Sequence, residues 1–259
     1  MEVSRRVLLA APLLAAAVPA RTQKLPLAAV PIARLQVAWW KARHEAKIAE
    51  LRQIRPDLVF LGDSITQNWE LIGPPPWMDF APVWQRLYGA RHAVNLGFPG
   101  DATSHLLWRI TNGELDGIAP KAAVLLIGAN NLGRLHWPGA DSILGIETVV
   151  AETRRRLPNT KLLLLGVLPS IRSVWASETT ATINAGLAAR YGGAGVPGVT
   201  YLDVGGVFMK DGKVDPAQFY DPLLSPAEPP LHPTAQAQER MALAYEGVLA
   251  GMLGDRPRS

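Results

Sequence analysis

The sequence predicts an α/β fold in which helices cover both faces of a parallel sheet. Five short apolar runs, each followed by a glycine or an aspartate, are typical of strands that are buried on both sides. Amphipathic stretches lie between most of these runs, and such alternation favours parallel strands joined by right-handed crossovers. The chain has 259 residues, of which 48% are hydrophobic and 19% charged, as is typical of one folded domain with short appendages.

The order of the elements follows from the apolar patterns. The expected strands are residues 57–61, 92–96, 122–127, 161–165 and 199–202. The expected helices are residues 32–54, about 103–112, 141–157, 177–192 and about 234–252. In this architecture ligands bind outside the carboxyl ends of the strands, so the residues that follow each apolar run are the first candidates for a functional site.

The N-terminus has the pattern of an export signal. Arg5 and Arg6 precede an apolar run that ends in Val18-Pro19-Ala20, which is a small-residue cleavage pattern. We therefore expect a signal peptide over residues 1–20 and a protein that is exported, either periplasmic or secreted. The arginine pair fits a twin-arginine signal and an ordinary secretory signal equally well. The run is too short and too broken by prolines for a stable membrane span.

The remaining chain divides into a linker over residues 21–31 and one domain over residues 32–254. There is no cysteine, which excludes disulfides and thiolate metal sites. The histidines lack the spacing of metal ligands, so no metal site is expected. The net charge of +4 is mild, and its densest cluster, Arg154-Arg155-Arg156, suits the end of a solvated helix. No nucleic-acid partner is expected.

Polar turns follow the first three strands. Gly62-Asp63-Ser64 follows the first, Gly97 the second and Gly128-Ala129-Asn130 the third, and His232 precedes the last helix. Each motif alone is an ordinary turn or cap, and we expect Asp63 to tie its loop together through backbone contacts. Together the motifs would meet at one edge of the sheet, with the Ser64 hydroxyl at the start of a helix.

This set of blocks resembles the SGNH, or GDSL-type, hydrolases. The segment from Asn95 to Leu115 is also similar to the catalytic subunits of intracellular platelet-activating-factor acetylhydrolase. The resemblance implies a three-layer α/β/α sandwich with a five-stranded parallel sheet, the flavodoxin-like SGNH hydrolase fold. It also implies ester hydrolysis without a cofactor. Because related subunits pair, it leaves a homodimer open.

The resemblance assigns roles to four residues. Ser64 is the expected nucleophile and His232 the base that takes its proton. The expected oxyanion donors are the backbone N–H groups of Ser64 and Gly97 and the side-chain amide of Asn130.

One position departs from the family pattern. The family carries an aspartate three residues before the histidine, and this chain has Pro229 there. We expect Glu228 to orient His232, and two alternatives stay open. Asp221 could take that role, or a backbone carbonyl or a water could replace the carboxylate.

Three functions are compatible with these residues. The first is a serine esterase for small acyl groups, similar to an acetylesterase, that acts on a small-molecule or carbohydrate ester. The second is a lysophospholipase or thioesterase for longer acyl chains. The third is an inactive hydrolase fold that binds carbohydrate, which the Pro229 departure alone favours.

Overall fold

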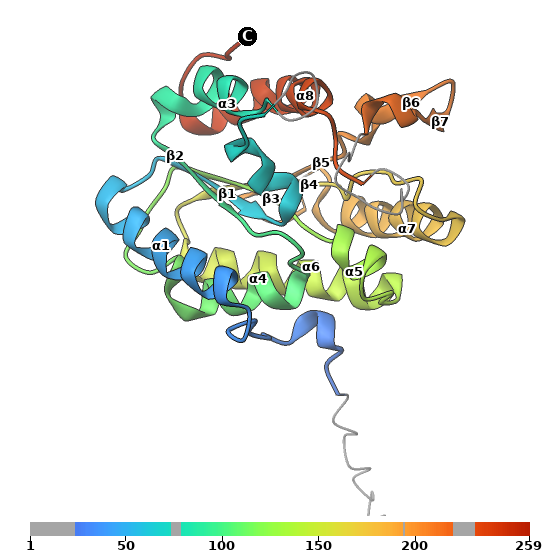
Figure 1. Cartoon of the computed structure of the whole chain (residues 1–259), viewed down its shortest axis with the longest axis horizontal. Helices are drawn as coiled ribbons and strands as arrows, with labels where there is room; N and C mark the ends of the chain where they lie inside the picture. The colour runs from blue at the N-terminus through green and yellow to red at the C-terminus, as the bar shows by residue number, and fades with distance from the viewer. Residues whose placement is uncertain (1–23, 74–78, 194, 220–230) are drawn as a thin grey trace, which may run out of the picture.

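A computed structural model of the chain describes residues 24–73, 79–193, 195–219 and 231–259. Its centre is a five-stranded, all-parallel sheet in the order β2-β1-β3-β4-β5 (Figure 1). The strands are β1 (Leu58–Gly62), β2 (Ala93–Gly97), β3 (Ala122–Leu126), β4 (Lys161–Leu165) and β5 (Val199–Leu202). This is the flavodoxin-like strand order, and it confirms the predicted fold class.

Helices cover both faces of this sheet. Their bounds are α1 (Ala38–Ile54), α2 (Ser64–Gln67), α3 (Ala81–Tyr88), α4 (Thr103–Arg109), α5 (Ala129–Gly133), α6 (Gly139–Arg156), α7 (Val174–Tyr191) and α8 (Ala235–Leu253). Figure 1 shows α3 and α8 together on one side of the sheet and α1, α4 and α6 on the other. A small antiparallel hairpin, β6 (Met209–Lys210) with β7 (Lys213–Val214), precedes α8. Among the residues that the structure describes, no helix is both long and apolar enough to cross a membrane.

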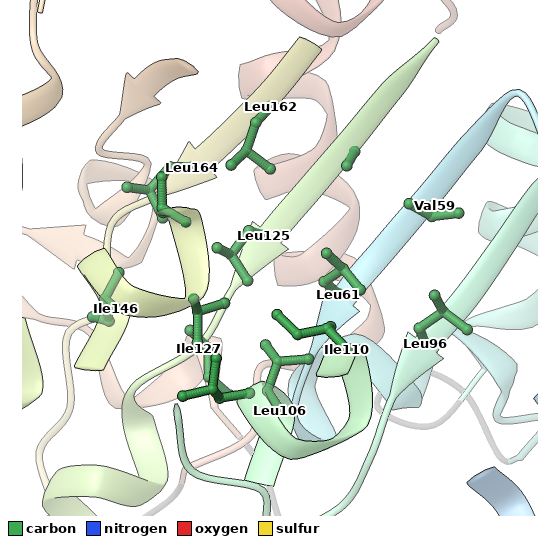
Figure 2. Close-up of a cluster of buried hydrophobic side chains, with 14 of the residues drawn as sticks. Val59, Leu61, Leu96, Leu106, Ile110, Leu125, Ile127, Ile146, Leu162 and Leu164 are labelled. Atoms are coloured by element: carbon green, nitrogen blue, oxygen red, sulfur yellow. The ribbon is translucent and has the colours of Figure 1, made fainter. Parts of the chain in front are cut away.

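Alternate residues of each strand supply two separate cores. Val59 and Leu61 point toward α4 and α6, where they pack with Leu106 and Ile146 (Figure 2). Their neighbours Leu58 and Phe60 face α3 and α8. Because successive strand residues point to opposite faces, a strand that is covered on both sides must be apolar throughout. This explains why the strands are continuous apolar runs in the sequence.

The segment expected to be a linker is part of the packed domain over its described residues. A single 3₁₀ turn, Leu27–Ala29, buries both alanines against α4 and α6. The Thr103 hydroxyl donates to the Ala28 carbonyl at 2.8 Å. Gly145 of α6 faces this turn, and an added Cβ at that position would come within 2.6 Å of the Ala28 carbonyl oxygen. The absence of a side chain at Gly145 therefore lets this turn sit against α6.

Several helices differ from the sequence prediction: α7 begins at Val174 and not at residue 177, and α5 was not expected. Two further helices differ for a local reason. The first begins at Ala38 and not at residue 32, because residues 35–37 form a turn in which the Val37 N–H donates to the Arg34 carbonyl. The second, α3, was not expected. It has only eight residues with Pro82 in its first turn, which makes its periodicity too short to recognise.

Candidate active site

The nucleophile turn is built between two neighbouring strands. β1 ends at Gly62, and an added Cβ there would come within 2.5 Å of the Leu126 carbonyl oxygen of β3, so only glycine fits. The Asp63 side chain caps α2 by accepting the Ile65 N–H at 3.0 Å, which confirms the expected backbone contact. Ser64 is therefore the first residue of α2, at the carboxyl edge of the sheet.

The structure brings Ser64 and His232 together from positions 168 residues apart. The Nε2 atom of His232 lies 2.8 Å from the Ser64 Oγ atom. Thr234 caps α8 by accepting the Ala237 N–H at 3.1 Å, and the Gln238 side chain donates to the Ile65 carbonyl at 3.0 Å. The first turn of α8 is thus attached to α2, and this attachment holds the histidine over the serine.

The structure does not support Gly97 as an oxyanion donor. Its N–H donates to the Asn95 Oδ1 atom at 2.8 Å and is therefore already engaged. An added Cβ at Gly97 would lie 2.8 Å from the Asp63 carbonyl oxygen and 2.7 Å from the Thr66 carbonyl carbon. Glycine is needed here because α2 packs directly on the end of β2, and not because a substrate approaches.

Gly100, and not Gly97, lies at the opening of the site. It lines the same cleft as Ser64, Asn130 and His232, and its backbone has a φ of 75°. Its N–H makes no hydrogen bond to the part of the chain that the structure describes. The signal in the sequence was a second glycine three residues further on, directly before Asp101.

Asn130 also lines the cleft, as predicted, at the start of α5. Its side-chain amide donates to the Asp101 carbonyl at 3.0 Å and makes a long contact of 3.4 Å with the Asp63 carboxylate. The first bond fixes the orientation of the side chain, and the second is weak enough to exchange for a better acceptor. The neighbouring Asn131 has a structural role, since its amide bonds both the N–H and the hydroxyl of Thr103.

The carboxyl group next to the nucleophile is buried. Burial raises the pKa of Asp63 to about 7, and the negative charge of Asp101 adds to this rise, although the Ile65 N–H opposes it. Near neutral pH the group is therefore partly protonated. This lowers the negative charge that would otherwise lie beside the Ser64 hydroxyl.

A fully buried cluster of charged side chains packs against the turns that follow β1 and β2. The Arg109 Nε atom donates to Asp101 at 2.9 Å, its terminal nitrogens bond Glu114 and the Gly62 carbonyl, and its guanidinium lies over the Phe98 ring at 3.9 Å. No pattern in the sequence predicts this cluster of Arg109, Asp101 and Glu114. It ties the end of β1 to the loop that carries Gly100.

The orienting acid falls outside the described residues. Glu228, Asp221 and Pro229 all lie within residues 220–230, so the assignment of Glu228 stays a prediction. Within the described ranges no three His, Asp or Glu side chains gather in a metal-binding arrangement.

The assembled site opens into a cleft of about 700 Å³. Its described lining residues are Arg34, Trp39, Ser64, Pro99, Gly100, Asn130, Gly133, Arg134, Arg172, Leu231 and His232. A much smaller apolar pocket of about 20 Å³ adjoins it, with Leu231, Gly133 and Arg172 common to both. The cleft has the parts that nucleophilic acyl transfer requires: a hydroxyl in contact with an imidazole, and free backbone N–H donors nearby.

Comparison with known proteins places these residues in a family. The model of the GDSL-like lipase/acylhydrolase family matches residues 60–240. The human platelet-activating factor acetylhydrolase IB subunit alpha2 is 36% identical over 131 residues, which are 50% of this chain and 52% of that protein. The chain thus spans about half the length of this curated relative. The corresponding bovine alpha1 subunit is 35% identical over 131 residues, 50% of this chain and 51% of that protein.

Solved structures share the fold at low sequence identity. A GDSL-like lipase from Bacteroides thetaiotaomicron has a TM-score of 0.57 at 16% identity, and the match covers 81% of this chain and 97% of that one. A carbohydrate acetylesterase family member from Sinorhizobium meliloti has a TM-score of 0.56 at 17% identity, covering 76% and 98%. The family match spans Ser64, Asn130 and His232, and the chain therefore belongs to the GDSL-like lipase/acylhydrolase family.

Proposed function

We propose that this protein is a serine esterase that removes small acyl groups, acetyl above all, through an acyl-enzyme on Ser64. The observation that carries the proposal is the 2.8 Å contact between the Ser64 hydroxyl and His232 Nε2, inside a cleft that Asn130 and Gly100 also line. This intact pair argues against an inactive, carbohydrate-binding hydrolase fold.

The reaction follows from this geometry. Ser64 Oγ attacks the acyl carbon as His232 takes the hydroxyl proton, and the carbonyl π electrons move to the oxygen. The N–H groups of Ser64 and Gly100 and the Asn130 amide stabilise that oxyanion, each donor being worth roughly 3–4 kcal/mol in related sites. The C–O bond to the alcohol then breaks, and His232 returns the proton to the leaving oxygen. Water repeats the sequence to release the acid and restore Ser64.

The size of the small pocket supports a short acyl group. The wall of the pocket includes the chain neighbours of three site residues. They are Ile65 beside Ser64, Leu231 beside His232 and Ala129 beside Asn130. The other described lining residues are Leu132, Gly133, Val167, Leu168, Pro169, Ser170, Arg172, Ala176 and Thr180. A volume of about 20 Å³ holds about one water-sized group, which matches the methyl of an acetyl ester. The acetylhydrolase relatives carry the same acyl group in their name.

A longer acyl chain is the second candidate, and one observation favours it. An open cavity of about 510 Å³ lies against α7 and β5, and it shares Pro169 and Thr180 with the small pocket. If the wall between the two spaces moved aside, an extended acyl chain could pass from one into the other. A lysophospholipase or thioesterase would use the site in that way.

A series of p-nitrophenyl esters separates these candidates. We expect kcat/KM to fall by about tenfold or more from acetate to butyrate, because a misfitting methylene costs about 1–3 kcal/mol. Leu168→Ala should widen the pocket and raise kcat/KM for the butyrate ester relative to that for the acetate ester. Leu243→Ala, on the exposed side of α8, is the control and should leave this ratio unchanged. A rate that rises with chain length toward octanoate would support the second candidate. No turnover, and no fluorophosphonate labelling that depends on Ser64, would refute the esterase.

We also propose that the protein works outside the cytoplasm. This proposal rests on Arg5, Arg6 and the apolar residues that follow them. Mass spectrometry of the protein from its native host should find a chain that begins at Arg21. Replacing both arginines by lysine distinguishes the two routes: accumulation of the precursor assigns the twin-arginine route, and normal cleavage assigns the ordinary one. A full-length chain confined to the cytoplasm would contradict export.

A further inference from the structure

The mouth of the catalytic cleft is lined by arginines. Arg34, Arg134 and Arg172 come from three different parts of the chain: the segment before α1, the end of α5 and the loop after β4. None of the described lining residues is an aspartate or a glutamate. If the alcohol half of the substrate were uncharged, it would not account for this excess of positive charge in the cleft.

Two of these arginines meet beside the proposed oxyanion donor. The guanidinium nitrogen Nη1 of Arg34 lies 3.5 Å from the position that a Cβ on Gly100 would occupy, and Nη1 of Arg134 lies closer still. The acyl group is assigned to the small pocket, whose wall includes Ile65 and Ala129. The alcohol half of an ester at Ser64 must therefore extend into the open cleft, where these guanidinium groups lie.

The carboxylates nearest to these arginines do not neutralise them all. Asp101 is fully buried and pairs with both Arg34 and Arg109 at 2.9 Å, and Arg109 pairs further with Glu114. These four groups carry two positive and two negative charges, which balance. Arg134 is exposed and forms no ion pair within the described ranges, so its charge is left over.

The positive charges of the same arginines also act on a neighbouring histidine. Burial lowers the pKa of His105 to about 4. Asp101 opposes this shift, and the positive charges of Arg34, Arg109 and Arg134 add to it. His105 is therefore neutral at physiological pH and leaves the charge of the cleft to the arginines.

An exposed aromatic ring completes this surface. Trp39 keeps 46% of its surface exposed, and the Arg34 guanidinium carbon lies 5.4 Å from the ring centroid. An accessible indole beside a guanidinium suits a flat, partly apolar group that carries a negative charge. A pyranose ring with a carboxylate has this character.

We propose that the alcohol half of the substrate is anionic, and that Arg134 binds its negative group. The form that the cleft fits best is an acetylated acidic sugar whose ring contacts Trp39 and whose carboxylate pairs with Arg134. A guanidinium fork matches a carboxylate or a phosphate through two parallel N–H···O bonds. The proposal rests on the esterase function proposed above, because it assigns the leaving-group side of that site.

Matched substrate pairs test this assignment on the full-length protein. One pair is the methyl glycoside of 3-O-acetylgalacturonic acid and its uncharged methyl ester. The other is 1-butyl-2-acetylglycerol 3-phosphate and 1-butyl-2-acetylglycerol. We expect kcat/KM for the free galacturonate to exceed that of its ester by about tenfold at low ionic strength. Added salt should reduce this preference, because it screens exposed charges.

A matched pair of variants assigns the preference to a residue. Arg134→Gln should lower the ratio of charged to uncharged kcat/KM about fivefold, and Arg134→Lys should recover part of it. Arg52→Gln is the control. Arg52 is exposed near the end of α1, at the opposite edge of the sheet, and its replacement should leave the ratio unchanged. Intrinsic differences between the esters cancel in this comparison, since every variant is measured on the same pair.

Each remaining outcome has one meaning. Equal kcat/KM within both pairs, with p-nitrophenyl acetate still hydrolysed, would overturn the anionic leaving group and leave the esterase intact. A preference that survives in Arg134→Gln would overturn the role of that arginine. A preference confined to the phosphate pair would overturn the acidic sugar and assign the same subsite to a phosphate. Failure on every ester, p-nitrophenyl acetate included, would refute the esterase itself.

Discussion

His232→Asn is expected to reduce kcat/KM for acetyl esters by roughly 10³-fold or more, because loss of the base leaves the Ser64 hydroxyl unactivated. The imidazole is the group in contact with Ser64 Oγ, at 2.8 Å. His232 is only partly buried, so the thermal midpoint should change little. Steady-state kinetics with p-nitrophenyl acetate and thermal unfolding of the same preparation measure both quantities.

His92→Asn is the matched control for that variant. His92 precedes β2 at the opposite edge of the sheet, and its φ of 45° is a conformation that asparagine tolerates well. This variant should retain wild-type kinetics. If His232→Asn kept activity within about tenfold of wild type, another group would have to be the base.

Arg109→Met is expected to destabilise the fold by about 3–5 kcal/mol, because it leaves the buried Glu114 without its partner and removes one of the two arginines that pair with Asp101. Asp101 and Glu114 are both completely buried and both pair with this side chain. Burial already raises the pKa of Glu114, while Arg109 acts in the opposite direction. Urea denaturation should show a lower midpoint with little change in slope.

Two further variants bracket this result. Arg109→Lys keeps a positive charge but loses the fork that reaches Asp101, Glu114 and the Gly62 carbonyl at once, so it should be intermediate. Arg155→Met removes an exposed pair with Glu152 and should leave the urea midpoint unchanged. An unchanged midpoint in Arg109→Met would show that the buried cluster adds no stability.

Most of the fold could be predicted from the sequence because a strand covered on both faces must be apolar along its whole length. The run from Leu58 to Leu61 is such a strand, and the five predicted strands match the structure to within a residue or so at their ends. Ser64 and His232 could be expected together only through the resemblance to the GDSL-type hydrolases, because each motif alone is an ordinary turn or cap.

The errors concern what only the assembled structure decides. Gly97 and Gly100 both follow a strand, and the sequence does not say which one faces the cleft. The register that pairs Gly62 with Gly97 places Gly97 under α2 and leaves Gly100 at the opening. Arg34 falls within the expected helix of residues 32–54, and nothing in that pattern points to its partner Asp101, which is 67 residues away. Periodicity carries no information about a contact of that range.

The attachment of α8 to α2 makes the contact between Ser64 and His232 depend on the docking of the C-terminal helix. Ser64 lies in the first third of the sequence, and the hydroxyl meets its base only when Gln238 reaches the Ile65 carbonyl. Helix ends that open locally do so at lower free energy than the whole domain unfolds. Activity should therefore be lost before the sheet melts, and a chain that has not yet docked its C-terminal helix cannot hydrolyse any ester.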